Sequence, residues 1–227
     1  MTFTNSNKAR SHVFIDESID GTENNFNRYV ISSVVFHSDV RAAKVAFEAA
    51  GFRNGFKASE YGRSIRHGRL RTMTRWLETQ EFECFAVALK PAETSPEVTR
   101  QILLREVFNY WSTKGLDRYF MDSRDHLEST KWKMNARDIS TLNELISIES
   151  VPRNSHISFH KDEEDFRFAI ADFLDGSLSY ENPLVDNQNI INGVLHLGEL
   201  VASETCIRQP VQELGPSIGG APQGAQL

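Results

Sequence analysis

Cysteine is scarce in this chain of 227 residues, and long runs of apolar residues are missing. The two cysteines, Cys84 and Cys206, lie far apart in the sequence, and no CxxC or Cys/His spacing surrounds them. We therefore expect neither a disulfide framework nor a structural zinc site, and a reducing cytoplasm fits this cysteine usage best. The first ten residues lack the apolar segment of a signal peptide. Apolar stretches such as 29–36 fall far short of about 18 residues, so we expect no membrane span.

Positive charge is also in the minority, with 25 Lys and Arg residues against 31 Asp and Glu residues and a formal net charge of −6. This balance argues against a general nucleic-acid coat or a membrane-surface protein, because both need net positive charge. Hydrophobic residues make up 40% of the chain, which is enough apolar surface to exclude collagen-like, mucin-like and wholly disordered classes. One large domain or two small ones would fit this length.

Short apolar runs alternate with amphipathic stretches along the chain, which is typical of one α/β domain. Ser38 is a suitable N-cap for one of the predicted helices, and Ser95 followed by Pro96 is a suitable start for another. We predict a flexible N-terminus over 1–10, one domain over 11–206 and a disordered tail rich in Gly and Pro over 207–227. The expected strands are 12–15, 28–36, 82–89, 118–121 and 155–159, and the expected helices are 39–50, 63–79, 96–113, 137–149, 165–178 and 186–205.

Carboxylates follow or interrupt these apolar segments at three places. Asp16 and Glu17 end the first predicted strand, and Asp122 ends the fourth. Asp172 lies in the middle of a helix among apolar residues, where an unpaired charge is costly to bury. Ligands of open α/β sheets bind at strand ends, and Mg²⁺ prefers carboxylate oxygens. Two such ions about 3.5–4 Å apart can activate water and stabilise the leaving oxygen of a phosphodiester.

Each carboxylate also has a simpler interpretation. Asp16 alone fits equally well as a cap of the turn that contains Asn24 and Asn25. Asp122 alone fits better as a turn residue before Arg124. The apolar neighbours of Asp172 argue against an exposed helix face. The joint pattern, rather than any single residue, favours a metal site.

Three short blocks resemble a known family. Residues 13–18, VFIDES, resemble the opening "(F/Y)xDESG" of the DUF3800 family of bacterial and phage-borne proteins. Residues 56–60, FKASE, resemble its second block, and residues 168–173 with Gly176 resemble its closing "LQxADxxxG" block. The blocks occur in the family's order and cover about 13–180. Two positions depart from the pattern: Ile19 stands near the family's Gly after the first block, and Ala169 stands at its Gln.

The resemblance implies an RNase H-like fold, with a mixed five-stranded sheet carrying helices on both faces, and a metal-dependent nuclease-type centre. By this resemblance Asp16, Glu60, Asp122 and Asp172 match the acidic positions, and we expect Glu17 to contribute to metal binding as well. The implied cofactor is Mg²⁺ or Mn²⁺. Because family members occur on mobile elements, the resemblance also suggests a role in phage defence.

Basic residues are concentrated in one segment, 53–75, which holds seven Lys and Arg residues and one acid, a local charge of +6 against −12 for the rest. Arginine binds phosphate bidentately, so this segregation suits a nucleic-acid substrate. The alternative is a solvated helix face, which is what most runs of charge form. The candidate nucleic-acid-binding residues are Lys57, Arg63, Arg66 and Arg69.

Three further residues are accessory candidates. His160, next to the fifth predicted strand, could move a proton near the metals. Asp165 could make an outer metal contact, although helix-dipole compensation also explains the acids around it. Ser18 fits a turn residue better than a nucleophile, because no Ser-His-Asp arrangement can be recognised.

Two hypotheses follow for the function. The first is a Mg²⁺-dependent phosphodiester hydrolase, a nuclease acting on DNA or RNA, with the carboxylates holding the ions. The second is a catalytically inactive binding subunit that docks a protein partner or another copy of itself through the last predicted helix or the tail. Ile19 and Ala169 favour the second hypothesis, and the retained acidic residues favour the first.

Overall fold

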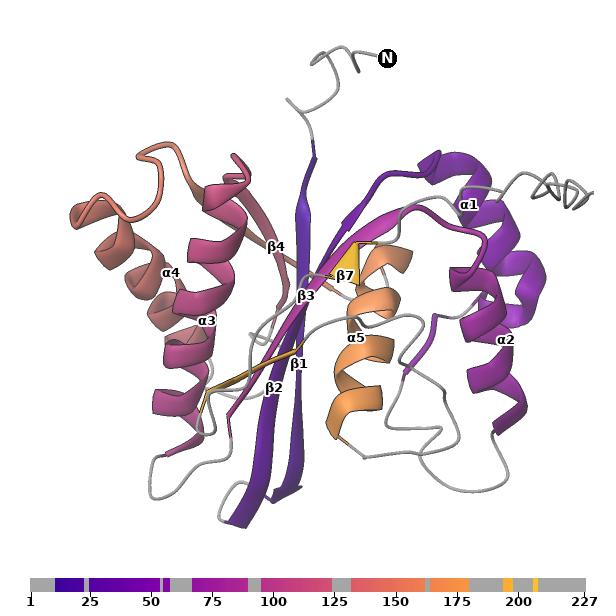
Figure 1. The fold of residues 1–227 in the computed structure, drawn as a ribbon, viewed down its shortest axis with the longest axis horizontal. Coiled ribbons are helices and arrows are strands. Elements are labelled where there is room, and N and C mark those ends of the chain that lie inside the picture. The colour runs from indigo at the N-terminus through magenta and orange to yellow at the C-terminus, as the bar shows by residue number, and fades with distance from the viewer. Residues whose placement is uncertain are drawn as a thin grey trace, which may run out of the picture.

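A mixed β-sheet runs through the middle of the protein and separates two groups of helices (Figure 1). The structure is a computed structural model, and it describes residues 11–22, 25–53, 55–57, 67–89, 95–123, 132–161, 164–179, 194–197 and 206–207. The strands are β1 (Val13–Thr22), β2 (Asn25–Phe36), β3 (Phe82–Leu89), β4 (Arg118–Asp122), β5 (His156–His160), β6 (Val194–Leu197) and β7 (Cys206–Ile207). The helices are α1 (Val40–Phe47), η2 (Glu48–Phe52), α2 (His67–Leu77), α3 (Pro96–Thr113), α4 (Trp132–Ser147) and α5 (Phe166–Ser179).

The strand order is β5-β4-β1-β2-β3-β6, and β7 also pairs with β3. Strands β1, β2 and β3 form an antiparallel meander, whereas β4 pairs parallel to β1 and β5 parallel to β4. Five strands in this order and with these directions form an RNase H-like sheet, which confirms the predicted fold class. All five predicted strands are present, and β6 and β7 extend the sheet beyond β3.

The prediction of a final helix over 186–205 is wrong where the structure describes that segment. Val194–Leu197 forms β6, which pairs in parallel with β3, and Cys206–Ile207 forms β7. The β3–β7 register also places Cys206 opposite Cys84, a buried free cysteine. β-branched and aromatic residues of β3 leave an edge whose backbone groups need partners, and this demand outweighs the local helical pattern. The expected docking through a C-terminal helix therefore loses its basis.

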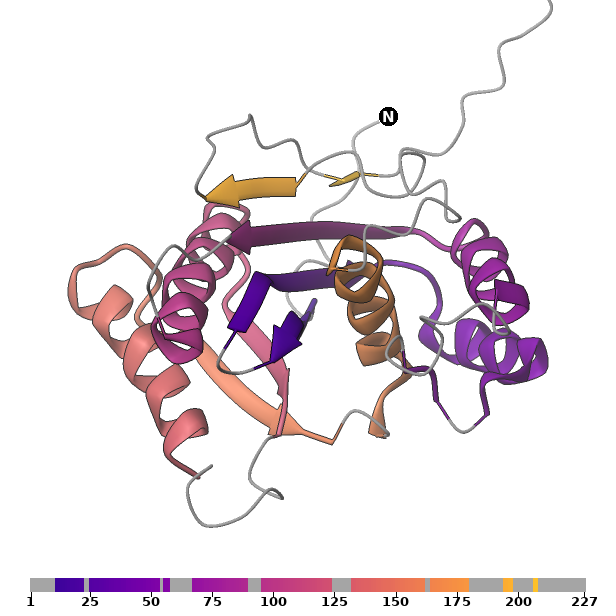
Figure 2. The same cartoon turned by 90° about the horizontal axis from the view of Figure 1, so that it is seen from below.

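Each face of the sheet has its own apolar core, as the view from below shows (Figure 2). Helices α1, α2 and α5 cover one face, around Phe47, Met73 and Phe173. Helices α3 and α4 cover the other face, around Phe108, Trp111 and Leu142. We call these the α5 face and the α3/α4 face. Because side chains alternate along a strand, neighbouring residues of β1 enter different cores.

Capping explains where two of the helices begin. Ser95 accepts a hydrogen bond from the Val98 amide at the start of α3, as the sequence predicts. At α1 the predicted cap Ser38 is wrong, because the Asp39 side chain accepts from the Ala42 amide instead. The Ser38 hydroxyl accepts from the Glu81 amide at 2.7 Å. Among the described residues, no helix is long and apolar enough to cross a membrane.

Candidate active site

Asp16 and Asp122 lie side by side on the α5 face. The β1–β4 register pairs Ile15 with Met121, so the next residues of these parallel strands, Asp16 and Asp122, stand at the same level. Parallel neighbours lie about 4.8 Å apart, which brings the two side chains close together. Phe14, two residues before Asp16, packs its ring edge-on against Phe168 of α5 at 5.2 Å, which identifies the face.

Helix α5 places Asp172 over these two carboxylates. The Ser32 hydroxyl on β2, the register partner of Asp16, donates to the Ala171 carbonyl at 2.6 Å. Ser32 is 1% exposed, so this bond fixes α5 against the sheet one residue before Asp172. The structure thus brings together three of the carboxylates that the sequence predicts, Asp16, Asp122 and Asp172.

Electrostatics confirm that these carboxylates are mutual neighbours. Burial is the largest cause of a pKa of Asp16 well above the usual range of an aspartic acid, and the charges of Asp172, Asp122 and Glu17 raise it further. The amide of Glu17 donates to Asp16 Oδ1 at 2.8 Å and offsets part of this rise. Crowded carboxylates of this kind can all be ionised at neutral pH only when a cation lies among them.

A cavity of about 280 Å³ opens on the same carboxylates. Asp16 and Asp172 line it together with the rings of Phe47, Phe52, Phe56, Phe166 and Phe168. Its remaining charged lining residues are the bases Lys44, Arg53 and Lys57 and the acids Glu48 and Glu164. With three bases and four acids, the lining keeps one excess negative charge. A phosphate group would therefore need a cation to enter beside Asp16.

Asp175, one turn after Asp172, is a fourth carboxylate of this cluster that the sequence analysis misses. It is 0% exposed, and neither carboxylate oxygen has a hydrogen bond of ordinary geometry among the described residues. Burial chiefly raises its pKa well above the usual range, with further contributions from Asp16, Asp172 and Glu17, although the Gly176 amide opposes this rise. The signal was present in the sequence, because Asp175 also interrupts an apolar helical stretch.

Glu17 points away from this cluster, and its predicted role as a metal ligand is a correction. Its register partner Ile31 belongs to the core of the α3/α4 face, and so does its neighbour Ile15. The Glu17 carboxylate accepts a hydrogen bond from the Tyr29 hydroxyl at 2.8 Å and another from Arg100. The alternation of a β-strand directs it opposite to Asp16.

The predicted basic residues are divided. Lys57 lines the cavity. Arg69 donates to the Gly51 carbonyl at 2.9 Å and lies 5.3 Å from the centre of the Phe52 ring, so it holds α2 against η2. Glu60, Arg63 and Arg66 lie outside the described residues. The other cations of the cavity, Lys44 and Arg53, reach it from α1 and from the end of η2, a proximity that only the tertiary fold creates.

The accessory candidates also separate. His160 is the register partner of Asp122, so His160, Asp122 and Asp16 stand in a row on three parallel strands. The buried His160 Nε2 has no hydrogen-bond partner among the described residues. Asp165 accepts hydrogen bonds from the backbone and side chain of Arg167, at 3.0 and 2.8 Å, and is thus engaged there. Ser18 follows Asp16 by two residues on the same face of β1.

The donor set fits a divalent cation. Among the described residues, no three His, Cys, Asp or Glu side chains form a group that could hold a metal ion. A pair of carboxylates with water and substrate oxygens suffices for Mg²⁺, which retains several waters. The unpartnered oxygens of Asp175 and the raised pKa of Asp16 indicate a local excess of negative charge that such an ion would neutralise.

Comparisons with known proteins give solved structures only. No protein-family model matches the chain, and no curated protein sequence matches it. It is similar to RNase HII of Archaeoglobus fulgidus, solved in complex with PCNA, at 15% identity over 76% of this chain and 74% of that chain with a TM-score of 0.43. A mutant of Bst-RNase HIII gives 11%, 75%, 52% and 0.44, and ribonuclease H2 from Pyrococcus horikoshii gives 9%, 76%, 73% and 0.42, in the same order. We base the RNase H-like assignment on strand order and direction.

Proposed function

We propose that this protein is a metal-dependent phosphodiester hydrolase, a nuclease of the kind that the DUF3800 resemblance implies. The observation that carries the proposal is the convergence of Asp16, Asp122 and Asp172 on the α5 face, beside a cavity whose wall also carries three basic residues. Acidic floor and basic wall are the two requirements for binding a divalent cation and a phosphate together.

The roles of the residues follow from where they stand. Asp16 and Asp172 hold the cation, because both line the cavity, and Asp122 supports them from the neighbouring strand. Glu60 is a further expected ligand from its place in the second sequence block. A Mg²⁺ or Mn²⁺ ion bound there supplies an activated water and stabilises the charge on the phosphate.

Basic residues orient the nucleic acid. Lys44 and Arg53 lie across the cavity from the carboxylates and attract the phosphates that flank the reacting one. His160 stands beside Asp122 and is placed to hold a proton near the reaction. The chain's net charge of −6 gives weak binding elsewhere, so the grip on nucleic acid is local and sensitive to salt.

The experiment is a hydrolysis assay on labelled single-stranded and double-stranded DNA, RNA and hybrid oligonucleotides, with Mg²⁺, with Mn²⁺ or with a chelator. The wild-type chain should cleave at least one of them only when a divalent ion is present. The double variant Asp16→Asn, Asp172→Asn should lose cleavage while remaining folded. Cleavage that persists in this variant, or in the chelator, would overturn the proposal.

A further inference from the structure

A buried ionic network lies directly behind Asp16, on the α3/α4 face of the sheet. Its centre is Arg100 of α3, which is 3% exposed. The Arg100 guanidinium donates to Glu17 of β1 through Nε and to Asp138 of α4 through a terminal nitrogen. Asp138 is 0% exposed, and the Tyr29 hydroxyl of β2 donates to the same Glu17 oxygen as Arg100 does. Four elements are thus joined at one arginine.

Stability alone does not account for such a network. Burial opposes the charge of Arg100, and the neighbouring charge of Glu17 is the main effect that raises its pKa again. Buried ion groups of this kind are often no more stabilising than apolar residues of the same volume. Apolar residues would suit this position, because Leu103, Leu104 and the rest of the surrounding core are apolar.

The network is connected to the α5 face through one backbone amide. The amide of Glu17 donates to Asp16 Oδ1 at 2.8 Å. Arg100 and Tyr29 fix the Glu17 side chain on one face, and this fixes the direction of its amide. The carboxylate of Asp16, on the other face, takes its orientation from that amide. Partners that orient a metal ligand from behind usually matter 10–100-fold for metal affinity, roughly the effect of losing such a partner.

We propose that Arg100 is a positioning residue, which holds Glu17 so that the adjacent Asp16 carboxylate faces the cavity in the orientation that binds a divalent cation. This inference rests on the proposed function and adds a residue to it from the far side of the sheet. It also gives Glu17 a role: it orients Asp16 rather than binding the ion.

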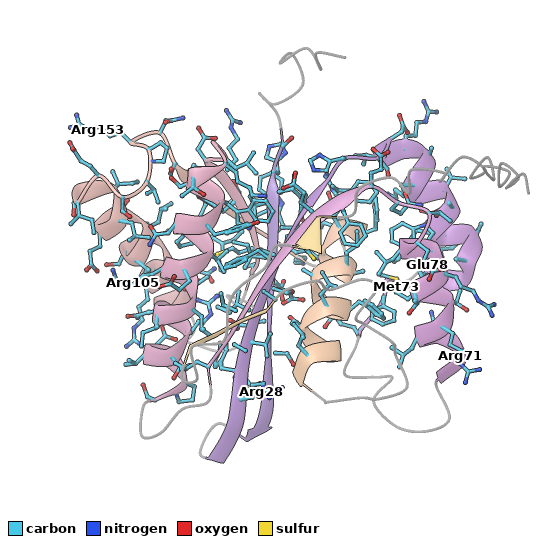
Figure 3. The ribbon with its side chains drawn as sticks, in the orientation of Figure 1. Arg28, Arg71, Met73, Glu78, Arg105 and Arg153 are labelled. Atoms are coloured by element: carbon cyan, nitrogen blue, oxygen red, sulfur yellow. The ribbon has the colours of Figure 1, made fainter. Side chains whose placement is uncertain are left out.

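The chain offers a matched control for this proposal. Arg105, one helical turn and a half further along α3, also pairs with a carboxylate of α4, Glu144. This second pair is exposed, with 32% of the Arg105 side chain and 57% of the Glu144 side chain open to solvent. Figure 3 labels Arg105 on the outer side of α3, away from the sheet. It therefore joins the same two helices without touching β1.

The experiment measures the dissociation constant of Mn²⁺ by electron paramagnetic resonance, well below the melting temperature of each variant. Arg100→Met should bind Mn²⁺ about 10–100-fold more weakly than wild type, the range expected for a lost orienting partner. Arg100→Lys keeps the buried charge but cannot hold two carboxylates in a fork, so its affinity should fall by roughly 10-fold. Arg105→Met should match wild type.

The outcomes are decisive. A purely structural role would lower the melting temperature of both Arg100 variants and leave their Mn²⁺ affinity within twofold of wild type, roughly the noise of such context-dependent effects; this result would overturn the proposal. If Arg100→Met does not fold, Arg100→Lys decides. A wild-type chain that binds Mn²⁺ but cleaves no phosphodiester would defeat the proposed function alone. A wild-type chain that binds no Mn²⁺ would overturn both.

Discussion

Two adjacent residues of β1, Asp16 and Glu17, carry the same charge into opposite environments. Asp16 enters a group of carboxylates with no basic side chain among the groups that shift its pKa, and that pKa is raised. Glu17 enters a core in which Arg100 and Tyr29 satisfy its carboxylate. The α3/α4 face is thus electrostatically complete, whereas the α5 face is left short of positive charge. An unfilled demand for a cation is a property of sites that bind one.

The largest expected effect separates these two faces by activity. Replacing Asp16 with Asn together with Asp172 with Asn should lower divalent-dependent cleavage by at least about 100-fold, because the groups that hold the charge of the transition state are removed. The exposed carboxylate of Glu78 on α2 provides the control, and Glu78→Gln should cleave as wild type does (Figure 3). Initial rates at saturating Mn²⁺ measure both. Equal losses in both variants would contradict a local site.

The next effect concerns the completeness of the α3/α4 face. Arg100→Met leaves the carboxylates of Glu17 and Asp138 buried without their cation, which should cost about 3–5 kcal/mol of unfolding free energy. Arg105→Met breaks an exposed pair between the same helices and should leave the denaturation midpoint unchanged. Urea unfolding followed by circular dichroism measures both variants. A small loss for Arg100→Met would mean that water or rearrangement satisfies the two carboxylates.

The incompleteness of the α5 face predicts a dependence on pH. Asp16 and Asp175 have raised pKa values in the folded protein, whereas an unfolded chain releases these protons near pH 3.9, roughly the reference value. The stability that these groups contribute is therefore complete below about pH 4 and is lost as the pH rises through their folded pKa values. Without metal, the melting temperature should fall from mildly acidic pH toward pH 8, and Mn²⁺ should restore it at pH 8.

Asp175→Asn tests the origin of this slope. Asn resembles the protonated acid in shape and carries no charge, so the variant should be more stable than wild type at pH 8 by about 1–3 kcal/mol, the cost of an unsatisfied buried group. Its melting temperature in a chelator should also vary less with pH. A pH slope identical to that of wild type would show that Asp175 does not titrate with the cluster.

The smallest expected effect concerns the basic wall of the cavity. Lys44→Gln and Arg53→Gln should each raise the KM a few-fold and leave kcat nearly unchanged, because the flanking phosphates are held equally before and during reaction. Each should also reduce the salt slope of binding by about 1. Arg153→Gln is the control, since Arg153 is 83% exposed and lies beyond α4 (Figure 3). Equal effects of all three variants would indicate nonspecific attraction.

Local patterns predict the sheet and part of the site. Apolar runs ending in Asp16 and Asp122 predict two strands whose parallel ends meet, and the structure brings these residues together. The period of two also contains the correction for Glu17, since adjacent residues of a strand face opposite ways. Asp175 likewise satisfies the criterion that identifies Asp172, a carboxylate inside an apolar helical stretch.

Other features depend on contacts between distant parts of the chain. Arg100 meets a partner 83 residues away, and Lys44 reaches the cavity from a helix with no distinguishing motif. Pairing with β3 makes a strand of 194–197, which local propensity assigns to a helix. In each case tertiary packing decides, and a single sequence carries no pattern for it.

Anomalous diffraction from crystals soaked in Mn²⁺ tests the central claim most directly, that the carboxylates of the α5 face hold a divalent cation. We predict a strong peak among Asp16, Asp122 and Asp172, beside the cavity and on the side opposite to Arg100. The same peak should disappear in Asp16→Asn, Asp172→Asn. Ordered carboxylates without a peak between them, in crystals that show Mn²⁺ elsewhere, would contradict the claim.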